Sequence, residues 1–314
     1  MLDRPITLAI SPNVEKEDVL EAIKTIFQPW LWQKGKAIDQ VERWFKEYFG
    51  VNRVYLFNSG RSSLYTLLKS LGIGIGDEIL IQAFTCVAVP DPIIWTGAKP
   101  VYVDIDKSLN INIKALEKLI NRKTKAIIVQ HTFGIPAKIE KIKLIAQKYN
   151  LILIEDCAHS LGAFYKNKKI GTFGDYSFFS FGRDKILSSV FGGALIVNKR
   201  NSKLNDKLES AYKKIVYPNY YWIFQQLLHP IATVLVLYFY KFFLGKLLLV
   251  MLQKARLLSK PVYKEEYYGG KPVFFPARYP NALAKLLLIQ LNKLLKYNNK
   301  RIYNSHYYFN MFKN

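Results

Sequence analysis

The sequence predicts an α/β protein whose mainly parallel β-sheet is covered by helices on both faces. Short, continuously apolar runs alternate with amphipathic stretches from Arg53 to Val197, and a strand that is buried on both faces needs such a run. The alternation of strands and helices favours parallel pairing through helical crossovers. The expected strands are Val54–Phe57, Glu78–Gln82, Pro100–Val103, Ala126–Gln130, Leu151–Glu155, Tyr176–Phe181 and Ala194–Val197.

Amphipathic stretches predict helices between these strands and before them. They are Lys16–Phe27, Ala37–Phe49, Ile113–Ile120 and Ile139–Tyr149. Beyond the last strand the chain becomes rich in aromatic and aliphatic residues. We therefore expect three parts: N-terminal helices with a large α/β domain over 1–200, an apolar, aromatic-rich helical insert over 201–270, and the start of a truncated C-terminal domain over 271–314.

Composition indicates a globular protein, because half of the 314 residues are hydrophobic and 22% are charged. The net charge of +23 raises nucleic-acid binding as a question. However, the lysines are spread over the whole chain, without an interleaved aromatic-basic motif or zinc-ligand spacing, so we expect no nucleic-acid partner. An anionic membrane surface or a phosphorylated substrate suits a basic protein equally well.

The two cysteines, Cys86 and Cys157, form no CxxC motif and stand in or beside apolar runs expected to form buried strands. Residues 1–10 show no basic start followed by an apolar run, so we expect no signal peptide. Both observations favour a reducing, cytoplasmic location.

Ile231–Leu252 is the one candidate for membrane contact. Its 22 residues would reach about 33 Å as a helix, enough to span a bilayer. Lys241 falls at its centre and Lys246 follows, and each would cost roughly 2.5–3.5 kcal/mol at mid-bilayer. A buried or interfacial helical hairpin broken near Gly245 is therefore favoured over surface attachment to a membrane, and both over a true span.

Three motifs carry chemistry. The first, Phe57–Ser63, stands between an expected strand and the helical stretch Leu64–Ser70. A strand that turns through Ser-Gly into a helix leaves free N–H groups at a positive helix end, which suits a phosphate. Gly60, Arg61 and Ser62 would supply donors there. An ordinary helix N-cap would explain the same residues.

The second motif, Leu151–His159, is an apolar strand that ends in Glu155 and Asp156. Open α/β sheets bind ligands at this end of their strands. Strand alternation sends the two acids to opposite faces, so one can face the site while the other anchors structure. A pyridinium nitrogen would compensate the buried charge, and His159 could bond the same ligand. A structural ion pair or a metal site would be alternatives, although the ligand count looks too low for a metal.

The third motif, Gly174–Lys185, places Ser180 and Lys185 five residues apart after a strand, with a Gly-Gly pair following at 192–193. Neighbouring cations such as Arg183 would lower the pKa of an amine nucleophile. A solitary lysine is usually a solvated surface charge. The neighbouring motifs make Lys185 a candidate nucleophile.

In this order and spacing the motifs resemble the DegT/StrS family of pyridoxal-phosphate (PLP)-dependent sugar aminotransferases, which have the aspartate-aminotransferase-like fold, the type I fold of PLP-dependent transferases. The likeness runs from Ile6 to about Tyr308. Further matching segments are Leu71–Glu78, Gly97–Asp104, His131–Gly134 and Gly192–Ala194.

The resemblance implies a role for each candidate residue. Lys185 would be the Schiff-base lysine that also moves the proton. Asp156 would pair with the ring nitrogen of PLP, and His159 would lie beside its phenolic oxygen. The phosphate would contact Ser180 and the turn at Gly60, Arg61 and Ser62.

Several positions depart from the family pattern. Cys86 stands where the family usually has an aromatic residue over the ring, Arg61 replaces a threonine, and Arg183-Asp184 replaces Thr or Ser. Of the family's Asn-Tyr-Arg motif, which reaches the neighbouring protomer, only Arg278 remains as a substrate-binding candidate.

The resemblance predicts a homodimeric, cytoplasmic aminotransferase without a metal, which moves an amino group, with glutamate as the expected donor, to a nucleotide-linked keto-sugar for polysaccharide or glycan synthesis. We also expect residues 231–252 of this enzyme to contact a membrane surface peripherally. The alternative is a catalytically altered, membrane-peripheral relative that keeps the fold as a binding or scaffold module.

Overall fold

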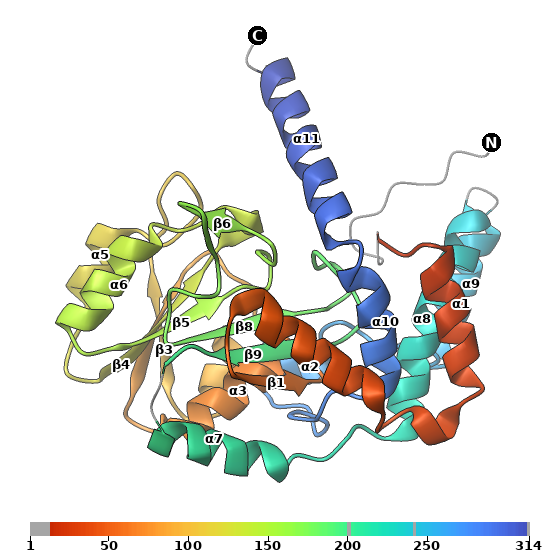
Figure 1. Cartoon of the computed structure of the whole chain (residues 1–314), viewed down its shortest axis with the longest axis horizontal. Coiled ribbons are helices and arrows are strands. Elements are labelled where there is room, and N and C mark those ends of the chain that lie inside the picture. Colours follow the sequence, from red (N-terminus) through yellow and green to blue (C-terminus); the bar gives the residue numbers. More distant parts are fainter. Residues whose placement is uncertain (1–12, 200–201, 241–242, 313–314) are drawn as a thin grey trace.

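The computed structural model describes residues 13–199, 202–240 and 243–312. Its helices are α1 Lys16–Ile26, α2 Lys36–Phe49, α3 Gly60–Ser70, α4 Pro90–Ile94, α5 Ile113–Leu119, α6 Ile139–Lys148, α7 Ser202–Lys213, α8 Tyr220–Tyr238, α9 Leu244–Lys254, α10 Asn281–Leu291 and α11 Leu294–Phe312. Its strands are β1 Arg53–Phe57, β2 Glu78–Gln82, β3 Lys99–Val103, β4 Thr124–Gln130, β5 Ile152–Asp156, β6 Phe164–Tyr165, β7 Lys168–Lys169, β8 Tyr176–Ser180 and β9 Gly193–Val197. Figure 1 shows their arrangement.

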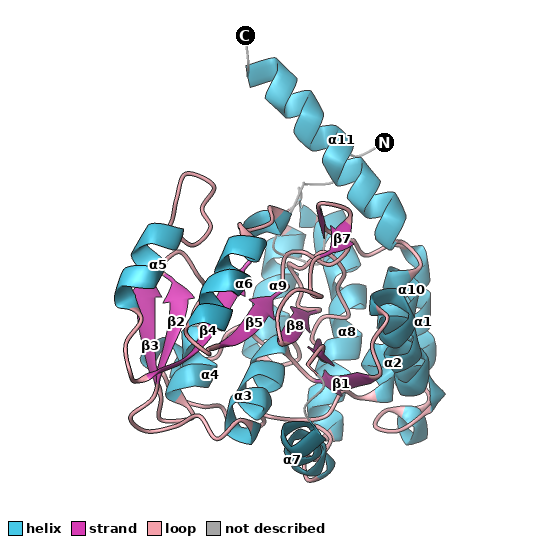
Figure 2. Cartoon of the chain, turned by 60° about the vertical axis from the view of Figure 1, so that its left-hand side comes forward, coloured by secondary structure: helices cyan, strands magenta, loops and turns pink. Residues whose placement is uncertain are grey.

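Seven of these strands form one sheet in the order β1-β9-β8-β5-β4-β2-β3. The pairs from β8 through β5, β4 and β2 to β3 are parallel. Strand β9 runs antiparallel to both of its neighbours, β1 and β8. Figure 2 shows this sheet across the centre of the molecule, with helices on both sides. The prediction of a mainly parallel, doubly covered sheet is confirmed.

Alternate residues of the strands pack on opposite faces of the sheet. On one face, Leu80 and Ile127 join a buried cluster with side chains of α2, α5, α6 and α10. On the other, Ile79 and Ile128 join a cluster with α3, α4 and α7. Each aliphatic side chain buried in this way stabilises the fold by roughly 1.5–3 kcal/mol. Continuous apolar runs in the sequence are the consequence of having two covered faces.

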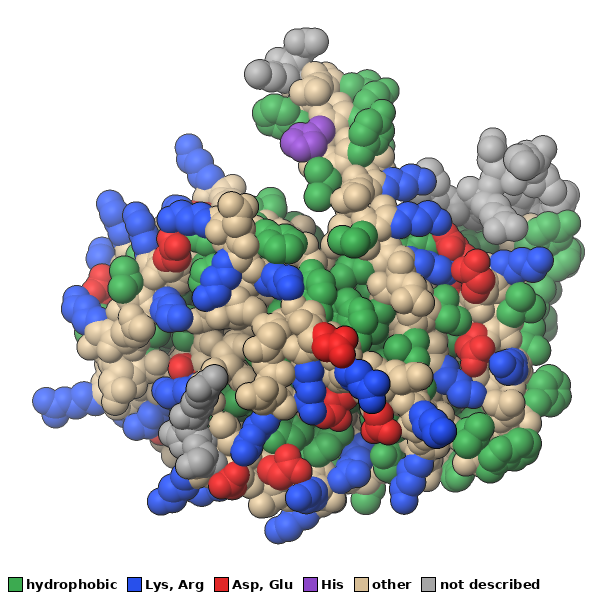
Figure 3. Space-filling view, viewed as in Figure 1, with side chains coloured by type: hydrophobic (Ala, Val, Ile, Leu, Met, Phe, Trp, Pro, Cys, Tyr) green, Lys and Arg blue, Asp and Glu red, His purple; other side chains and the backbone are tan. Residues whose placement is uncertain are grey.

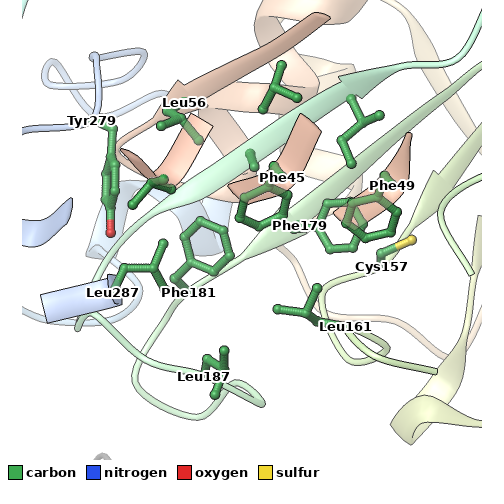
Figure 4. Close-up of a cluster of buried hydrophobic side chains, with 14 of the residues drawn as sticks. Phe45, Phe49, Leu56, Cys157, Leu161, Phe179, Phe181, Leu187, Tyr279 and Leu287 are labelled. Carbon is green, nitrogen blue, oxygen red and sulfur yellow. The ribbon is translucent and has the colours of Figure 1, made fainter. Parts of the chain in front are cut away.

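The aromatic part of the first cluster determines which way Ser180 points. Phe179 and Phe181 lie on the face that packs against Phe45 of α2, with ring centroids 5.6 and 5.7 Å away (Figure 4). Because side chains alternate along a strand, Ser180 between them faces the opposite side, toward α3. The packing of the core thus positions a polar residue of the candidate site.

The apolar candidate segment forms a helical hairpin. Helix α8 ends at Tyr238 and α9 begins at Leu244. Tyr221 and Gln225 in α8 both donate hydrogen bonds to the carbonyl of Arg256, so the second helix returns along the first. A Cβ atom at Gly245 would lie 2.2 Å from the Val236 carbonyl oxygen, which shows how closely the helices approach. Lys241 lies outside the described residues.

This hairpin agrees with the favoured sequence interpretation. Within the described residues no helix is both long and apolar enough to cross a membrane. The aromatic, polar end of the sequence forms α11, which stands away from the rest of the molecule in Figure 1. The three-part division of the chain stays a prediction.

Candidate active site

A cavity of about 330 Å³ lies where β5 and β8 end and α3 begins, in the size range of ligand sites. Seven of the eight cofactor-binding residues predicted from the sequence line it: Gly60, Arg61, Cys86, Asp156, His159, Ser180 and Lys185. The eighth, Ser62, is fully buried one turn into α3, where its hydroxyl donates to Asn58 Oδ1. The site follows from the fold, because parallel strands bring their carboxyl ends to one edge.

Glu155 and Asp156 point to opposite faces of β5, as strand alternation predicts. Glu155 is fully buried and accepts hydrogen bonds from the backbone N–H groups of Gly171, Phe173 and Gly174. It therefore anchors the segment that leads into β8.

Asp156 lines the cavity. Among the described residues its side chain accepts a backbone hydrogen bond from Ala158 N, at 3.0 Å. Burial raises the pKa of this carboxyl group, and the field of Lys185 opposes that rise. A buried carboxylate with so little compensation is a costly arrangement unless a cationic ligand group meets it.

Lys185 Nζ lies 3.0 Å from His159 Nε2 and 3.3 Å from Asp184 Oδ2. Burial and the neighbouring Lys185 lower the pKa of His159 to about 4, so the imidazole is neutral at neutral pH and accepts from the ammonium group. Its buried Nδ1 has no hydrogen-bond partner within the described residues. The ring of Phe133 stacks on His159, with centroids 5.9 Å apart and planes at 9°.

The amino end of α3 is open toward the same cavity. Ser59 caps the helix by accepting from Ser62 N at 3.1 Å, whereas the N–H groups of Gly60 and Arg61 have no acceptor within the helix. Strand β9 closes over this turn, because a Cβ atom at Gly193 would lie 2.5 Å from the Ser59 carbonyl. Gly193 is therefore required for the close approach. Helix-end N–H groups in this position suit an anion.

The side chain of Arg61 does not extend into this anion position. Its guanidinium pairs with buried Glu266, donates to the Pro261 carbonyl at 2.9 Å, and lies over the Phe275 ring. The side chain of Arg61, which replaces the family's threonine, thus holds the 261–266 segment to α3. Only the backbone N–H of Arg61 remains as a candidate donor to a phosphate. The partner, Glu266, is about 200 residues away in the sequence, so no local pattern predicts this contact.

The structure also places three other residues singled out in the sequence. Cys86 lies beside the predicted strand, exposed in the loop after β2, whereas Cys157 is buried directly after β5. Arg278 does not line the cavity. Its guanidinium donates to the carbonyls of Tyr212 and Lys213, so its role in substrate binding stays a prediction.

Sequence reasoning missed some lining residues. Gln130 at the end of β4, Arg183 in the lysine segment, and Pro261 and Val262 beyond α9 all face the cavity. The polar end of a predicted strand could have indicated Gln130. The last two come from the insert and carry no recognisable signal.

His131, Glu155 and Cys157 bring three atoms of metal-binding type within 4.8 Å of one another. Both ring nitrogens of His131 are engaged, Nε2 with Glu155 and Nδ1 as acceptor from Ala137 N. Glu155 is saturated by backbone donors. The candidate ligand atoms of His131 and Glu155 are therefore already engaged in structural hydrogen bonds.

Comparison with known proteins identifies the family of this chain. The model of the DegT/DnrJ/EryC1/StrS aminotransferase family matches residues 13–213. The chain belongs to this family. GDP-perosamine synthase of Vibrio cholerae is 34% identical over 194 residues, which are 62% of this chain and 53% of that protein. The chain spans about half the length of the curated relatives it matches.

Solved structures of this aminotransferase family share the fold. Helicobacter pylori PseC, an aminotransferase involved in the biosynthesis of pseudoaminic acid, has a TM-score of 0.65 and 25% identity, covering 91% of this chain and 65% of that one. NtdA from Bacillus subtilis, solved with the bound cofactor PMP, has a TM-score of 0.57 and 27% identity, covering 65% of this chain and 46% of that one. The predicted fold class is confirmed.

The residues of this chain fit the family's cofactor. Asp156 offers an undercompensated buried carboxylate to a protonated ring nitrogen, and the open end of α3 offers N–H donors to a phosphate. The unpartnered Nδ1 of His159 offers a further polar contact. Lys185 supplies a primary amine within the same cavity.

Proposed function

We propose that this chain is the cofactor-binding part of a PLP-dependent aminotransferase that moves an amino group from glutamate to a keto-sugar carried on a nucleotide. The product would be used for polysaccharide or glycan synthesis. The observation that carries the proposal is that Lys185 and Asp156, from different segments, face one cavity that also contains the open amino end of α3. Relatives that act on nucleotide-linked sugars support the substrate class.

Each residue of the site has a task in this reaction. When bound, PLP supplies an electron sink that lets a proton leave the carbon bearing the amine. Lys185 holds the cofactor through Nζ and then moves this proton as base and acid. Asp156 would stabilise a protonated ring nitrogen, and His159 would help to position the ring. Ser180 and the backbone N–H groups of Gly60 and Arg61 hold the phosphate.

The test is a cofactor spectrum of the purified chain before and after glutamate is added. We expect a visible band of lysine-bound cofactor that glutamate shifts toward the shorter wavelength of the aminated form. A control with Lys199→Ala, an exposed lysine paired with Asp175, should behave as wild type. A protein that never takes up PLP would exclude the proposal.

We further propose that the α8–α9 hairpin touches an anionic membrane surface. One face of α9 exposes Leu244, Leu247, Val250 and Met251, each by about half of its surface. Lys246 and Lys254 of the same helix are also exposed. Figure 3 shows hydrophobic side chains along the edge formed by α1 and α9, with basic groups among them. An apolar face with basic neighbours suits an interfacial helix.

Cosedimentation with vesicles tests this contact. We expect binding to phosphatidylserine-containing vesicles that weakens with salt and is lost in Leu247→Glu. Leu144→Glu, at an exposed leucine of α6, is the matched control and should bind as wild type. Equal binding by Leu247→Glu would contradict the proposal.

We also propose a cytoplasmic homodimer. The exposed Phe27 and Trp30, at 74% and 70% of their surface, are large apolar groups of the kind that subunit interfaces cover. Light scattering of the purified chain should then give twice its mass of 36.4 kDa. A monomer at all accessible concentrations would exclude the dimer.

Fractionation of cells should recover the protein with the cytoplasm and the inner face of the membrane.

A second candidate function is a binding or scaffold module with altered catalysis. It is favoured by Cys86, which puts an exposed thiol where a stacking aromatic would stand. PLP binding without any response to glutamate would support this candidate. Transfer of the amino group from glutamate to a nucleotide-linked keto-sugar would exclude it.

A further inference from the structure

Arg183 is a buried cation on the wall of the cavity. It lies two residues before Lys185, and only 8% of its surface is exposed. Its guanidinium donates to the hydroxyl of Ser259 at 2.6 Å and lies over the ring of Phe191, 5.6 Å from the centroid. Its Nε is buried without a hydrogen-bond partner in the part of the chain that the structure describes.

The surroundings of Arg183 do not neutralise its charge. The Ser259 hydroxyl donates in turn to Gln226 Oε1 at 2.7 Å, so this hydrogen-bond chain from Arg183 into the insert consists of neutral groups. The nearby acid, Asp184, bonds to Lys185 and is more than half exposed. Burial lowers the pKa of Arg183 to about 10, and the fields of Tyr263 and Asp184 oppose this. Among the described residues no carboxylate lies within ion-pair distance of its guanidinium.

Arg61 is a second arginine of the same cavity, and its charge is compensated by a buried partner. It is equally buried, at 8% exposed, but it pairs directly with Glu266. A buried charge without such a partner carries a desolvation cost of several kcal/mol. A bound anion would offset this cost, and guanidinium groups bind carboxylates and phosphates through paired N–H donors.

We propose that Arg183 is an oxyanion-binding residue of this site, which takes either the phosphate of the cofactor or a carboxylate of the amino donor. The chemistry of the ligand group is the same in both cases. The assignment rests on the proposed function for the identity of the ligand. Arg183 lines the cavity, and its hydrogen bond to Ser259, which in turn bonds to Gln226, fixes the position of its guanidinium.

The experiment compares Arg183→Gln and Arg183→Lys with wild type. Three quantities are measured: the affinity for PLP, the affinity for pyridoxal, which lacks the phosphate, and the glutamate concentration that converts half of the bound cofactor. If the ligand is the phosphate, Arg183→Gln weakens PLP binding about 10- to 100-fold and leaves pyridoxal binding unchanged. If it is the donor carboxylate, PLP affinity is unchanged and the glutamate requirement rises by a similar factor. Arg183→Lys should lie between.

Ser259→Ala is the control for a purely structural role. It removes the hydrogen bond from Arg183 to the insert and keeps the charge, so ligand affinity should stay within about twofold of wild type. Equal losses of ligand affinity in Ser259→Ala and Arg183→Gln would show that Arg183 only supports the packing of the insert. That result would overturn the assignment. So would wild-type affinities in folded Arg183→Gln. If Arg183→Gln does not fold, the Lys variant decides, because the assignment requires it to weaken one of the two ligands.

The proposed function and this inference fail separately. A wild-type chain that binds no PLP removes the proposed function. Protection of the fold by inorganic phosphate and by glutamate, followed as a rise in Tm, still tests Arg183 in that case. The assignment requires at least one of these anions to raise the Tm of wild type more than that of Arg183→Lys. The assignment would be overturned if each anion raised the Tm of wild type and of Arg183→Lys by the same amount. It would also be overturned if neither anion raised the Tm of wild type.

Discussion

Lys185 Nζ lies 3.0 Å from Nε2 of His159, and the imidazole is the acceptor of this bond. The neutral state of His159 follows from burial and from the adjacent cation, which together lower its pKa to about 4. The candidate nucleophile is thus held against the neutral histidine within the cavity.

The stability of the fold should depend on pH through His159. The folded pKa, about 4, lies below the ordinary histidine value of 6.5, so between these values the unfolded chain binds more protons and stability rises with pH. His159→Asn lacks this dependence. Urea unfolding of both proteins from pH 4 to 7 should show wild type gaining up to about 3 kcal/mol on the variant. A constant difference across this range would contradict the neutral histidine.

Asp156 and Glu155 should respond in opposite ways to removal of their charge. Asp156→Asn removes a poorly compensated buried carboxylate, so the cofactor-free fold should keep or gain stability while PLP affinity falls roughly 10- to 100-fold. Glu155→Gln weakens several backbone hydrogen bonds and should cost about 2–4 kcal/mol of unfolding free energy. Thermal unfolding without PLP, followed by PLP titration, measures both. A stability loss in Asp156→Asn as large as that in Glu155→Gln would be inconsistent with this division of roles.

The close approach of β9 to the phosphate turn predicts a large effect of one methyl group. Gly193→Ala places a Cβ atom 2.5 Å from the Ser59 backbone, so the turn must move, at a cost of about 1–3 kcal/mol. PLP affinity should fall with it, because Gly60 N–H shifts. Gly74→Ala is the matched control, since its new Cβ would meet nothing nearer than 3.4 Å. Calorimetry of the two variants should separate them clearly; similar unfolding temperatures would argue against the tight turn.

The Arg61–Glu266 pair should hold the insert to the α/β domain. Glu266→Gln leaves Arg61 buried without a counter-charge and should destabilise the fold by about 3–5 kcal/mol. Replacing both, as Arg61→Met with Glu266→Leu, should cost much less, because no unpaired charge remains. Denaturant unfolding of the single and double variants measures the difference. A double variant that is as unstable as the single one would refute the ion-pair account.

Much of the fold could be predicted from the sequence, because each central strand is apolar on both faces. The expected strand Glu78–Gln82 is found unchanged, and the others differ by one or two residues at their ends. The antiparallel direction of β9 was not predicted, since the apolar pattern of a strand is the same in both directions. The short β6–β7 hairpin was missed because two residues per strand carry no periodicity.

The site was predictable to a more limited degree. Alternation required Glu155 and Asp156 to diverge, but only the family resemblance indicated which acid faces the ligand. The engagement of Arg61 with Glu266, and the approach of Arg183 to Ser259, join residues far apart in the sequence. Such contacts depend on where the insert packs, which local patterns do not contain.

The most direct test of the central claim is chemical trapping of the cofactor on Lys185. The purified chain is incubated with PLP, reduced with borohydride, digested, and analysed by mass spectrometry. We expect the added cofactor mass on the peptide that contains Lys185, together with loss of the visible absorbance band, and neither in Lys185→Ala. Label absent from wild type, or label equally strong in Lys185→Ala, would contradict the assignment of this lysine.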